Sequence, residues 1–467
     1  MRKAVITCSL LGLAALAGCP DRTISEVNPS QGRVEYKDIP VNLNRNIDIL
    51  FVIDDSGSMA DKQNNLAANF PNFIDVLNTI QGGLPDVHIG VVSSDMGVRA
   101  VDGNMAGSIP GCNNSGKNGA LQLGMAGGMI QNGDLFISDI KLPDNTRQFN
   151  YTGSLNTVFG AMARLGAMGC GFEQHLHAMR RALEGTTNPG FVRSDAFLAV
   201  IFIADEDDCS AGAKSLFEND GGPLGPLQSF RCTRFGVTCD TGGADTNAMN
   251  NVGVKGDCHP NDGSEHLAKV ADFVTFLKGM KPDPSQVIVA GVIGTTAPFA
   301  VEDRVINGNN QRALAHSCTY TPGGAQQPQV ADPPTRIQFF LDQFPNRSTS
   351  TTICQQDLSG GLQLIAQLLK TVIGDPCIEG MLADVDPDTA GDQYDCSASY
   401  VQNYGKPNQS ETVLPGCNDA LSNKPCFHLI EDATKCPNNS NLILKVEENM
   451  TAPTGTHLIA NCVTQAI

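Results

Sequence analysis

Residues 47–59 read "IDILFVIDDSGSM", an apolar run that changes abruptly into a cluster of oxygen-bearing side chains. The run at 47–53 is rich in β-branched residues and predicts a buried strand, and the small polar residues after it predict a tight turn before a helix. Asp54, Ser56 and Ser58 present oxygens at alternate positions of that turn. Capping of the following helix would explain one of these side chains but not three, which indicates a functional turn.

Three further apolar runs resemble the first, and amphipathic segments separate them. The predicted strands are 47–53, 86–94, 196–204 and 286–294, each nearly continuous in apolar residues, as strands buried on both faces are. The predicted helices are 59–80, 155–165, 173–184, 264–278, 335–344 and 359–374. This alternation predicts an α/β fold with a doubly wound, mostly parallel, Rossmann-like sheet that carries helices on both faces.

Sixteen cysteines and the N-terminus both indicate export. No Cys-x-x-Cys pair is present, so a disulfide framework in an oxidising compartment is favoured over a zinc or redox site. The start of the chain, "MRKAVITCSLLGLAALAGC", has basic residues, then an apolar stretch, then small residues before Cys19, and it predicts a signal peptide at 1–18. Apart from Cys8 and Cys19, fourteen cysteines remain, enough for seven bridges whose pairing stays open.

The end of this segment, "LAGC" at 16–19, resembles the lipobox of bacterial lipoproteins, in which the cysteine becomes the first residue and carries acyl chains such as palmitate. The resemblance implies that Cys19 anchors the protein to a membrane of the cell envelope, because more than one acyl chain holds stably. The alternative is an ordinary cleavage site with an incidental cysteine. No other apolar run is long enough for a transmembrane helix, so we expect the body to lie in water, at the outer membrane or cell surface or in the periplasm.

The chain is acidic, with 49 Asp and Glu residues against 31 Lys and Arg residues. Cleavage after residue 18 removes Arg2 and Lys3, so the formal charge of −18 becomes −20. Such a surface repels nucleic acid, which excludes that class of partner. Solubility explains most of the charge, and metal ions or basic partners are also compatible with it.

Composition divides the mature chain into three parts. Polar residues at 19–45 predict a tether. The sheet domain is predicted at 46–375, with disulfide-rich insertions at about 96–150 and 209–262 that fit the alternating pattern poorly. Six cysteines and short apolar runs then predict a small, disulfide-stapled, β-rich module at 376–467.

The turn at Asp54, Ser56 and Ser58 resembles the D-x-S-x-S motif of the metal-ion-dependent adhesion site (MIDAS) of von Willebrand factor type A (VWA) domains. In that family an aspartate after a middle strand and a threonine before a later helix complete a divalent-cation site. "VIFIADEDDCS" matches the aspartate with Asp205, and "GCGFEQHLHAMRRAL" puts Glu173 where the threonine is expected. The oxygen ligands imply Mg²⁺ or Ca²⁺. Glu173 has an alternative explanation as an acid favoured in a first helical turn.

A third carboxylate, if Glu173 is a ligand, would neutralise the cation further and make it less attractive to an acidic partner. The lipobox and the cysteine-rich tail also look like those of bacterial lipoproteins that carry a VWA domain. The resemblance therefore implies a lipid-anchored envelope protein that binds a protein partner, of identity unknown, through a carboxylate at the cation.

No nucleophile elbow, P-loop or dinucleotide fingerprint follows a predicted strand, so we expect no enzyme. Two alternatives remain open. One is a structural envelope lipoprotein without a metal function. The other is a metal-dependent hydrolase with Glu173 or Glu206 as general base.

Overall fold

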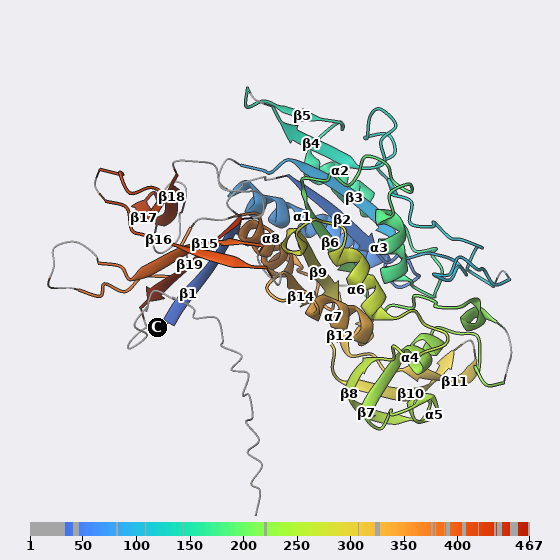
Figure 1. Ribbon diagram of the computed structural model, residues 1–467. Coiled ribbons are helices and arrows are strands. Elements are labelled where there is room, and N and C mark those ends of the chain that lie inside the picture. Colours follow the sequence, from blue (N-terminus) through green and yellow to red (C-terminus); the bar gives the residue numbers. More distant parts are fainter. Residues whose placement is uncertain are drawn as a thin grey trace, which may run out of the picture. The chain divides into compact units, whose positions relative to one another are not determined.

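The computed structural model describes residues 33–40, 46–80, 83–107, 109–142, 144–218, 222–306, 308–322, 327–374, 377–378, 380–386, 388, 393–403, 408–418, 420–433, 436, 441–448 and 456–465 (Figure 1). These belong to two compact units. One consists of 38–376 with 452–457, and the other of 377–451 and 458–467 with the residues up to 37. The predicted signal peptide at 1–18 and Cys19 lie outside the described residues.

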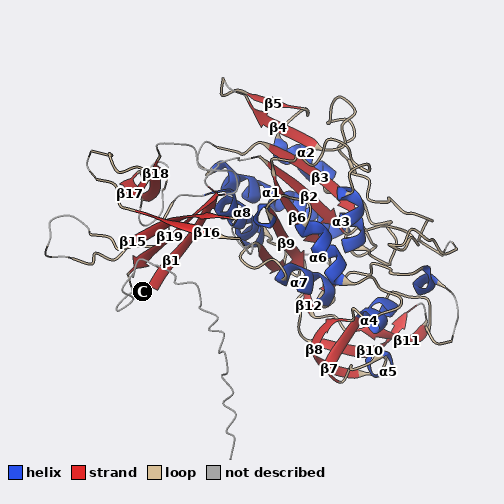
Figure 2. Cartoon of the chain, in the orientation of Figure 1, coloured by secondary structure: helices blue, strands red, loops and turns tan. Residues whose placement is uncertain are grey.

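A seven-stranded sheet forms the centre of the larger unit (Figure 2). Its strands, in spatial order, are β14 (Ser348–Thr352), β9 (Val287–Ile293), β6 (Phe197–Ile203), β2 (Ile47–Ile53), β3 (Val87–Ser93), β4 (Ile137–Lys141) and β5 (Arg147–Phe149). The first five run parallel, β4 pairs antiparallel with β3, and β5 pairs antiparallel with β4. All four strands predicted from apolar runs are central and fully buried, which confirms the mostly parallel α/β prediction.

Helices cover both faces of this sheet, as predicted. One face packs against α1 (Ala60–Asn78), α2 (Leu155–Met162) and α8 (Ser359–Gly374). The other packs against α3 (His175–Leu183), α6 (Val270–Lys278) and α7 (Thr335–Asp342). Successive strand residues alternate between the faces.

The packing around Phe51 fixes the helix that follows the opening turn. The Phe51 ring contacts Phe70 and Phe73 of α1, with centroids 6.2 and 6.1 Å apart, and Phe159 of α2 at 4.7 Å. Burial of such rings stabilises by roughly 1.5–3 kcal/mol each. The first turn of α1 is therefore held beside the carboxyl end of β2.

A second, four-stranded sheet of the larger unit joins two distant segments. It has the order β11-β10-β8-β7 and is antiparallel throughout. The 209–262 segment supplies η1 (Lys214–Phe217), α4 (Phe230–Gly236), β7 (Val237–Thr241), α5 (Thr246–Met249) and β8 (Gly253–Pro260), and the strands β10 (Phe299–Ile306) and β11 (Asn309–Leu314) follow β9. Three short elements complete the unit: η2 (Pro284–Gln286), β12 (Cys318–Tyr320) and β13 (Gln329–Ala331).

Three segments differ from the sequence analysis. Residues 33–40, expected in the tether, form β1 (Arg33–Pro40), whose alternation of charged and apolar residues is too short to stand out. Residues 137–149, expected in the first insertion, supply the two antiparallel edge strands of the main sheet. The hairpin at 299–314 was not expected, because its polar residues show no apolar run.

The smaller unit is a β module with two sheets. One has the order β1-β19-β15-β16, with β15 (Cys396–Gln402), β16 (Ser410–Leu414) and β19 (Thr456–Thr464). The other is a hairpin of β17 (Cys426–Glu431) and β18 (Leu442–Glu447). This agrees with the β-rich character predicted for the C-terminal part.

Seven disulfides among the described residues pair all fourteen cysteines that follow Cys19. They are Cys112–Cys170, Cys209–Cys232, Cys239–Cys258, Cys318–Cys354, Cys377–Cys436, Cys396–Cys462 and Cys417–Cys426. The predicted disulfide framework is confirmed. Within the same described residues, no helix has the length and apolar character needed to cross a membrane.

Candidate metal centre

The turn after β2 brings its oxygens to the carboxyl edge of the sheet. Asp54 donates its backbone N–H to the Ile203 carbonyl at 2.9 Å, which holds the turn against the end of β6. Asp54 Oδ1 accepts the Ser56 backbone N–H at 2.7 Å, and the Ser56 and Ser58 hydroxyls lie 3.3 Å apart. Helix α1 begins without a side-chain cap at Met59. The motif residues therefore shape the turn and do not cap the helix.

Asp205 follows β6 at the same edge, because β2 and β6 are adjacent and parallel. Its carboxylate is 2% exposed, and Oδ2 accepts a hydrogen bond from Lys62 Nζ at 2.7 Å. Lys62 also donates to the Ser58 carbonyl at 3.2 Å and to Gln329 Oε1 at 3.3 Å. An ammonium group thus lies between the opening turn and the aspartate.

Glu173 lies just before α3 and is held there by backbone contacts. The preceding segment packs tightly against the opening turn: Gly169 donates to the Asp55 carbonyl at 2.8 Å, and a Cβ at Gly169 would come 2.3 Å from Asp55 Oδ1. The Glu173 carbonyl accepts the Cys209 N–H at 2.7 Å. Its side chain is 2% exposed. Burial raises the pKa of Glu173 well above its ordinary value, and the nearby charges of Glu206 and Asp54 raise it further.

Three buried carboxylate oxygens at this edge lack a hydrogen-bond partner among the described residues: Asp54 Oδ2, Asp205 Oδ1 and Glu173 Oε1. Burial of an ionised oxygen without a donor or a cation is costly. A hard divalent cation would satisfy such oxygens, and it binds carboxylate and hydroxyl oxygen together. The exposed Ser58 opens the site to solvent. Carboxylate and hydroxyl oxygens are the ligand types that Mg²⁺ and Ca²⁺ take.

No group of three or more His, Cys, Asp or Glu side chains positioned to hold a metal ion is found within the described part of the chain. A site here would accordingly combine carboxylates with the Ser56 and Ser58 hydroxyls. Lys62 lies against Asp205 in this arrangement.

The buried acidic groups at the carboxyl edge of the main sheet favour the binding of a cation. Burial raises the pKa of Asp54 well above its ordinary value, and the charges of Asp205 and Glu206 add to the effect. Burial, with the charges of Asp332 and Asp205, raises the pKa of Glu206 to about 8. Each of these shifts reports that a negative charge is unfavourable there without more positive charge nearby.

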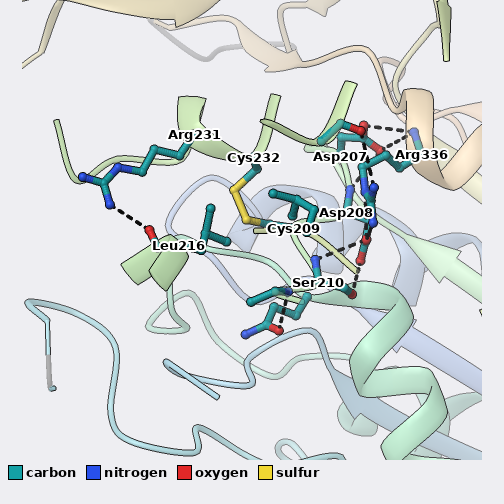
Figure 3. The surroundings of a disulfide bond; sticks show 12 residues. Asp207, Asp208, Cys209, Ser210, Leu216, Arg231, Cys232 and Arg336 are labelled. Atoms are coloured by element: carbon teal, nitrogen blue, oxygen red, sulfur yellow. Dashed lines mark hydrogen bonds and ion pairs between the residues drawn. A yellow bond between two sulfur atoms is a disulfide. The ribbon is translucent and has the colours of Figure 1, made fainter. Parts of the chain in front are cut away.

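The next two acids have structural roles (Figure 3). Asp208 is fully buried and accepts hydrogen bonds from Arg336 Nε and Nη2 at 3.2 and 3.1 Å. It also accepts the Leu176 N–H at 2.9 Å and the Ser210 hydroxyl at 2.6 Å. Asp207 accepts the Arg336 backbone N–H at 2.9 Å. These acids fasten α3 and α7 to the end of β6 and leave Asp205 to face the opening turn.

A cavity of about 190 Å³ adjoins the acidic edge. Glu173, Glu206 and the Cys209–Cys232 bridge contribute to its lining. Arg304 and Arg312, from the hairpin at 299–314, line it as well. Side chains of both charges therefore border the space next to the candidate ligands.

The chain was compared with known families, curated proteins and solved structures. No family model matches it, and no curated protein matches it. Among solved structures, it is similar to the pilus adhesin (RrgA) from Streptococcus pneumoniae at 11% sequence identity, over 93% of this chain and 58% of that chain, with a TM-score of 0.20. The chain thus spans little more than half of that adhesin chain, and a TM-score this low carries no argument about function.

Two groups at the site were not predicted from the sequence. Lys62 lies in the first turn of α1, and its contact with Asp205 depends on tertiary packing, so no local sequence signal identified it. His175 lies 4.0 Å from Asp54 Oδ2, and neither of its ring nitrogens has a hydrogen-bond partner among the described residues. Burial lowers the pKa of His175 to about 4, so the ring is neutral near pH 7.

Proposed function

We propose that residues 46–375 form a VWA-type domain that holds a divalent cation and uses it to bind a protein partner. The order of the main sheet, with an antiparallel edge beyond five parallel strands, supports this fold assignment. The single observation that carries the functional proposal is the group of three unpartnered, buried carboxylate oxygens beside the D-x-S-x-S turn.

In this proposal Asp54, Ser56, Ser58, Asp205 and Glu173 supply the ligands. The cation contributes a Lewis-acidic position at which an oxygen from a partner can bind. The exposure of Ser58 supports an approach from solvent. A carboxylate is the expected partner group, because it is the protein oxygen donor with the greatest affinity for a hard cation.

Cation binding is the first prediction. Calorimetric titration of Mg²⁺, Ca²⁺ or Mn²⁺ into the mature chain should give saturable binding at one site. The double change Asp54→Ala with Ser56→Ala should weaken it at least tenfold, because it removes a charged and a neutral oxygen ligand.

The control is Asp102→Asn, which removes an exposed carboxylate of the same unit. Its affinity should equal that of the wild type, and circular dichroism should show that all variants are folded. Equal heats from the wild type and the double variant would reject the metal site.

Partner capture from envelope extracts should depend on the cation and be lost in EDTA.

We also propose that Cys19 anchors the chain to the cell envelope, a proposal that rests on the "LAGC" sequence. The full chain expressed in a bacterium should partition into the detergent phase of a Triton X-114 extract and incorporate labelled palmitate. Cys19→Ser should abolish both properties. Unchanged labelling of that variant would show that the cysteine is incidental.

A further inference from the structure

Lys62 has an unusual environment. Its side chain is 1% exposed, and its ammonium group contacts the carboxylate of Asp205 at 2.7 Å. The ammonium group of Lys62 also donates to two neutral oxygens, the Ser58 carbonyl and Gln329 Oε1. Burial of an ammonium group is costly unless it is paired, so the surrounding acids determine where it lies.

Four carboxyl groups share this region with the ammonium: Asp54, Glu173, Asp205 and Glu206. If all four groups ionise, Lys62 offsets one negative charge of four. A divalent cation at the site would then meet a net charge of −3 instead of −4.

We propose that Lys62 is a resident cation that sets the divalent-cation affinity of the site. It does so by holding Asp205 Oδ2 and by repelling the incoming ion. This inference rests on the proposed function. It also gives a role to Glu173: the carboxylate that stands where the VWA family has a threonine adds one negative charge, and Lys62 balances it. The bound cation consequently keeps its attraction for an acidic partner.

A second contact shows that the position of Lys62 is built into the fold. Gln329, at the start of β13, accepts from Lys62 with its oxygen and donates to Asp61 Oδ2 with its nitrogen at 3.1 Å. The segment that precedes α7 therefore holds the first turn of α1 at two adjacent residues. The ammonium is fixed against Asp205 and has little freedom to swing into solvent.

The test compares Lys62→Gln with the wild type by titration of Mn²⁺ and Ca²⁺. The variant should bind at least tenfold more tightly, because repulsion by one buried charge is removed. The matched control is Lys269→Gln, which removes an exposed lysine of the same unit and should leave the affinity unchanged. Equal or weaker binding by Lys62→Gln would overturn the inference and would show that Lys62 only stabilises the fold.

Thermal unfolding gives a second readout. In EDTA, Lys62→Gln should melt below the wild type, because Asp205 loses its counter-charge, and 5 mM Ca²⁺ should raise its melting temperature by more than it raises that of the wild type. If the variant does not fold, Lys62→Arg replaces it. A guanidinium can engage both oxygens of Asp205, so binding should weaken at least fivefold, and unchanged affinity would overturn the inference.

The outcomes separate this inference from the proposed function. Binding by the wild type without tightening in Lys62→Gln rejects the role of Lys62 alone. Binding by Lys62→Gln without measurable binding by the wild type rejects a working metal site in the native chain and supports Lys62 as the resident cation. Absence of binding in both proteins rejects both.

Discussion

Arg336→Met should lower the free energy of unfolding by about 3–5 kcal/mol, the usual cost of leaving one charge of a buried ion pair without its partner. Both Arg336 and Asp208 have no exposed surface. The guanidinium bonds Asp208 through two nitrogens and also donates to the Ala268 carbonyl at 2.7 Å. Methionine can fill much of the space but donates no hydrogen bond, so Asp208 loses its charged donor and the Ala268 carbonyl loses the Arg336 donor.

The loss of stability should extend beyond the ion pair of Arg336 and Asp208. Asp208 also holds the first turn of α3 by accepting the Leu176 N–H. It bonds Ser210 on the 209–262 segment as well (Figure 3). Arg336 belongs to α7, so the pair ties α3, α7 and the end of β6 together. Weakening of this junction should therefore increase hydrogen exchange at the start of α3, close to Glu173.

Chemical denaturation of the wild type and the variant at pH 7 measures the first effect. The control is Arg180→Met, which removes a half-exposed arginine paired with Glu184 at 3.1 Å. That change should cost less than about 1 kcal/mol, as is typical of exposed helix pairs. Equal losses from the two arginine variants would show that burial does not set the strength of the Asp208 pair.

Replacement of Cys209 and Cys232 by serine should cost about 3 kcal/mol, because the bridge closes a loop of 23 residues and its loss frees the unfolded chain. Cys209 comes four residues after Asp205, and its N–H donates to the Glu173 carbonyl at 2.7 Å. The bridge also lines the cavity beside the acids. Its removal should therefore weaken cation binding several-fold in addition to lowering stability.

The control for this pair is Cys239–Cys258, which closes a loop of 19 residues and joins β7 to β8. Serine replacements there should cost a similar free energy of unfolding but leave the cation affinity unchanged. Denaturation and calorimetry on the two double variants separate the contributions. If both variants lose affinity equally, the Cys209–Cys232 bridge has no special connection to the site.

Local sequence predicted those strands whose position is set by burial alone. The four central strands could be predicted because burial on both faces demands an uninterrupted apolar run, as in 47–53. β14 could not, because "STSTT" is half-buried along its whole length and is held at the edge of the sheet by pairing with β9. The hairpin at 299–314 was missed for a related reason: its first strand, β10, pairs with the distant β8, for example Phe299 with Lys255.

At the candidate site, too, some features follow from local sequence and others only from tertiary packing. The turn at Asp54, Ser56 and Ser58 could be recognised locally, and parallel neighbours explain why Asp205 reaches the same edge. The contact between Lys62 and Asp205 joins residues 143 positions apart, and neither helix periodicity nor composition predicts such a pair.

The sequence by itself determined the disulfide-rich character of the chain, the mostly parallel sheet and the oxygen-bearing turn, because these depend on composition and on short-range patterns. The tertiary structure alone decided which cysteines pair, which buried oxygens lack donors and where the ammonium of Lys62 lies. Those properties depend on distances between segments that are far apart in the chain, and the packing of helices on both faces of the sheet sets these distances.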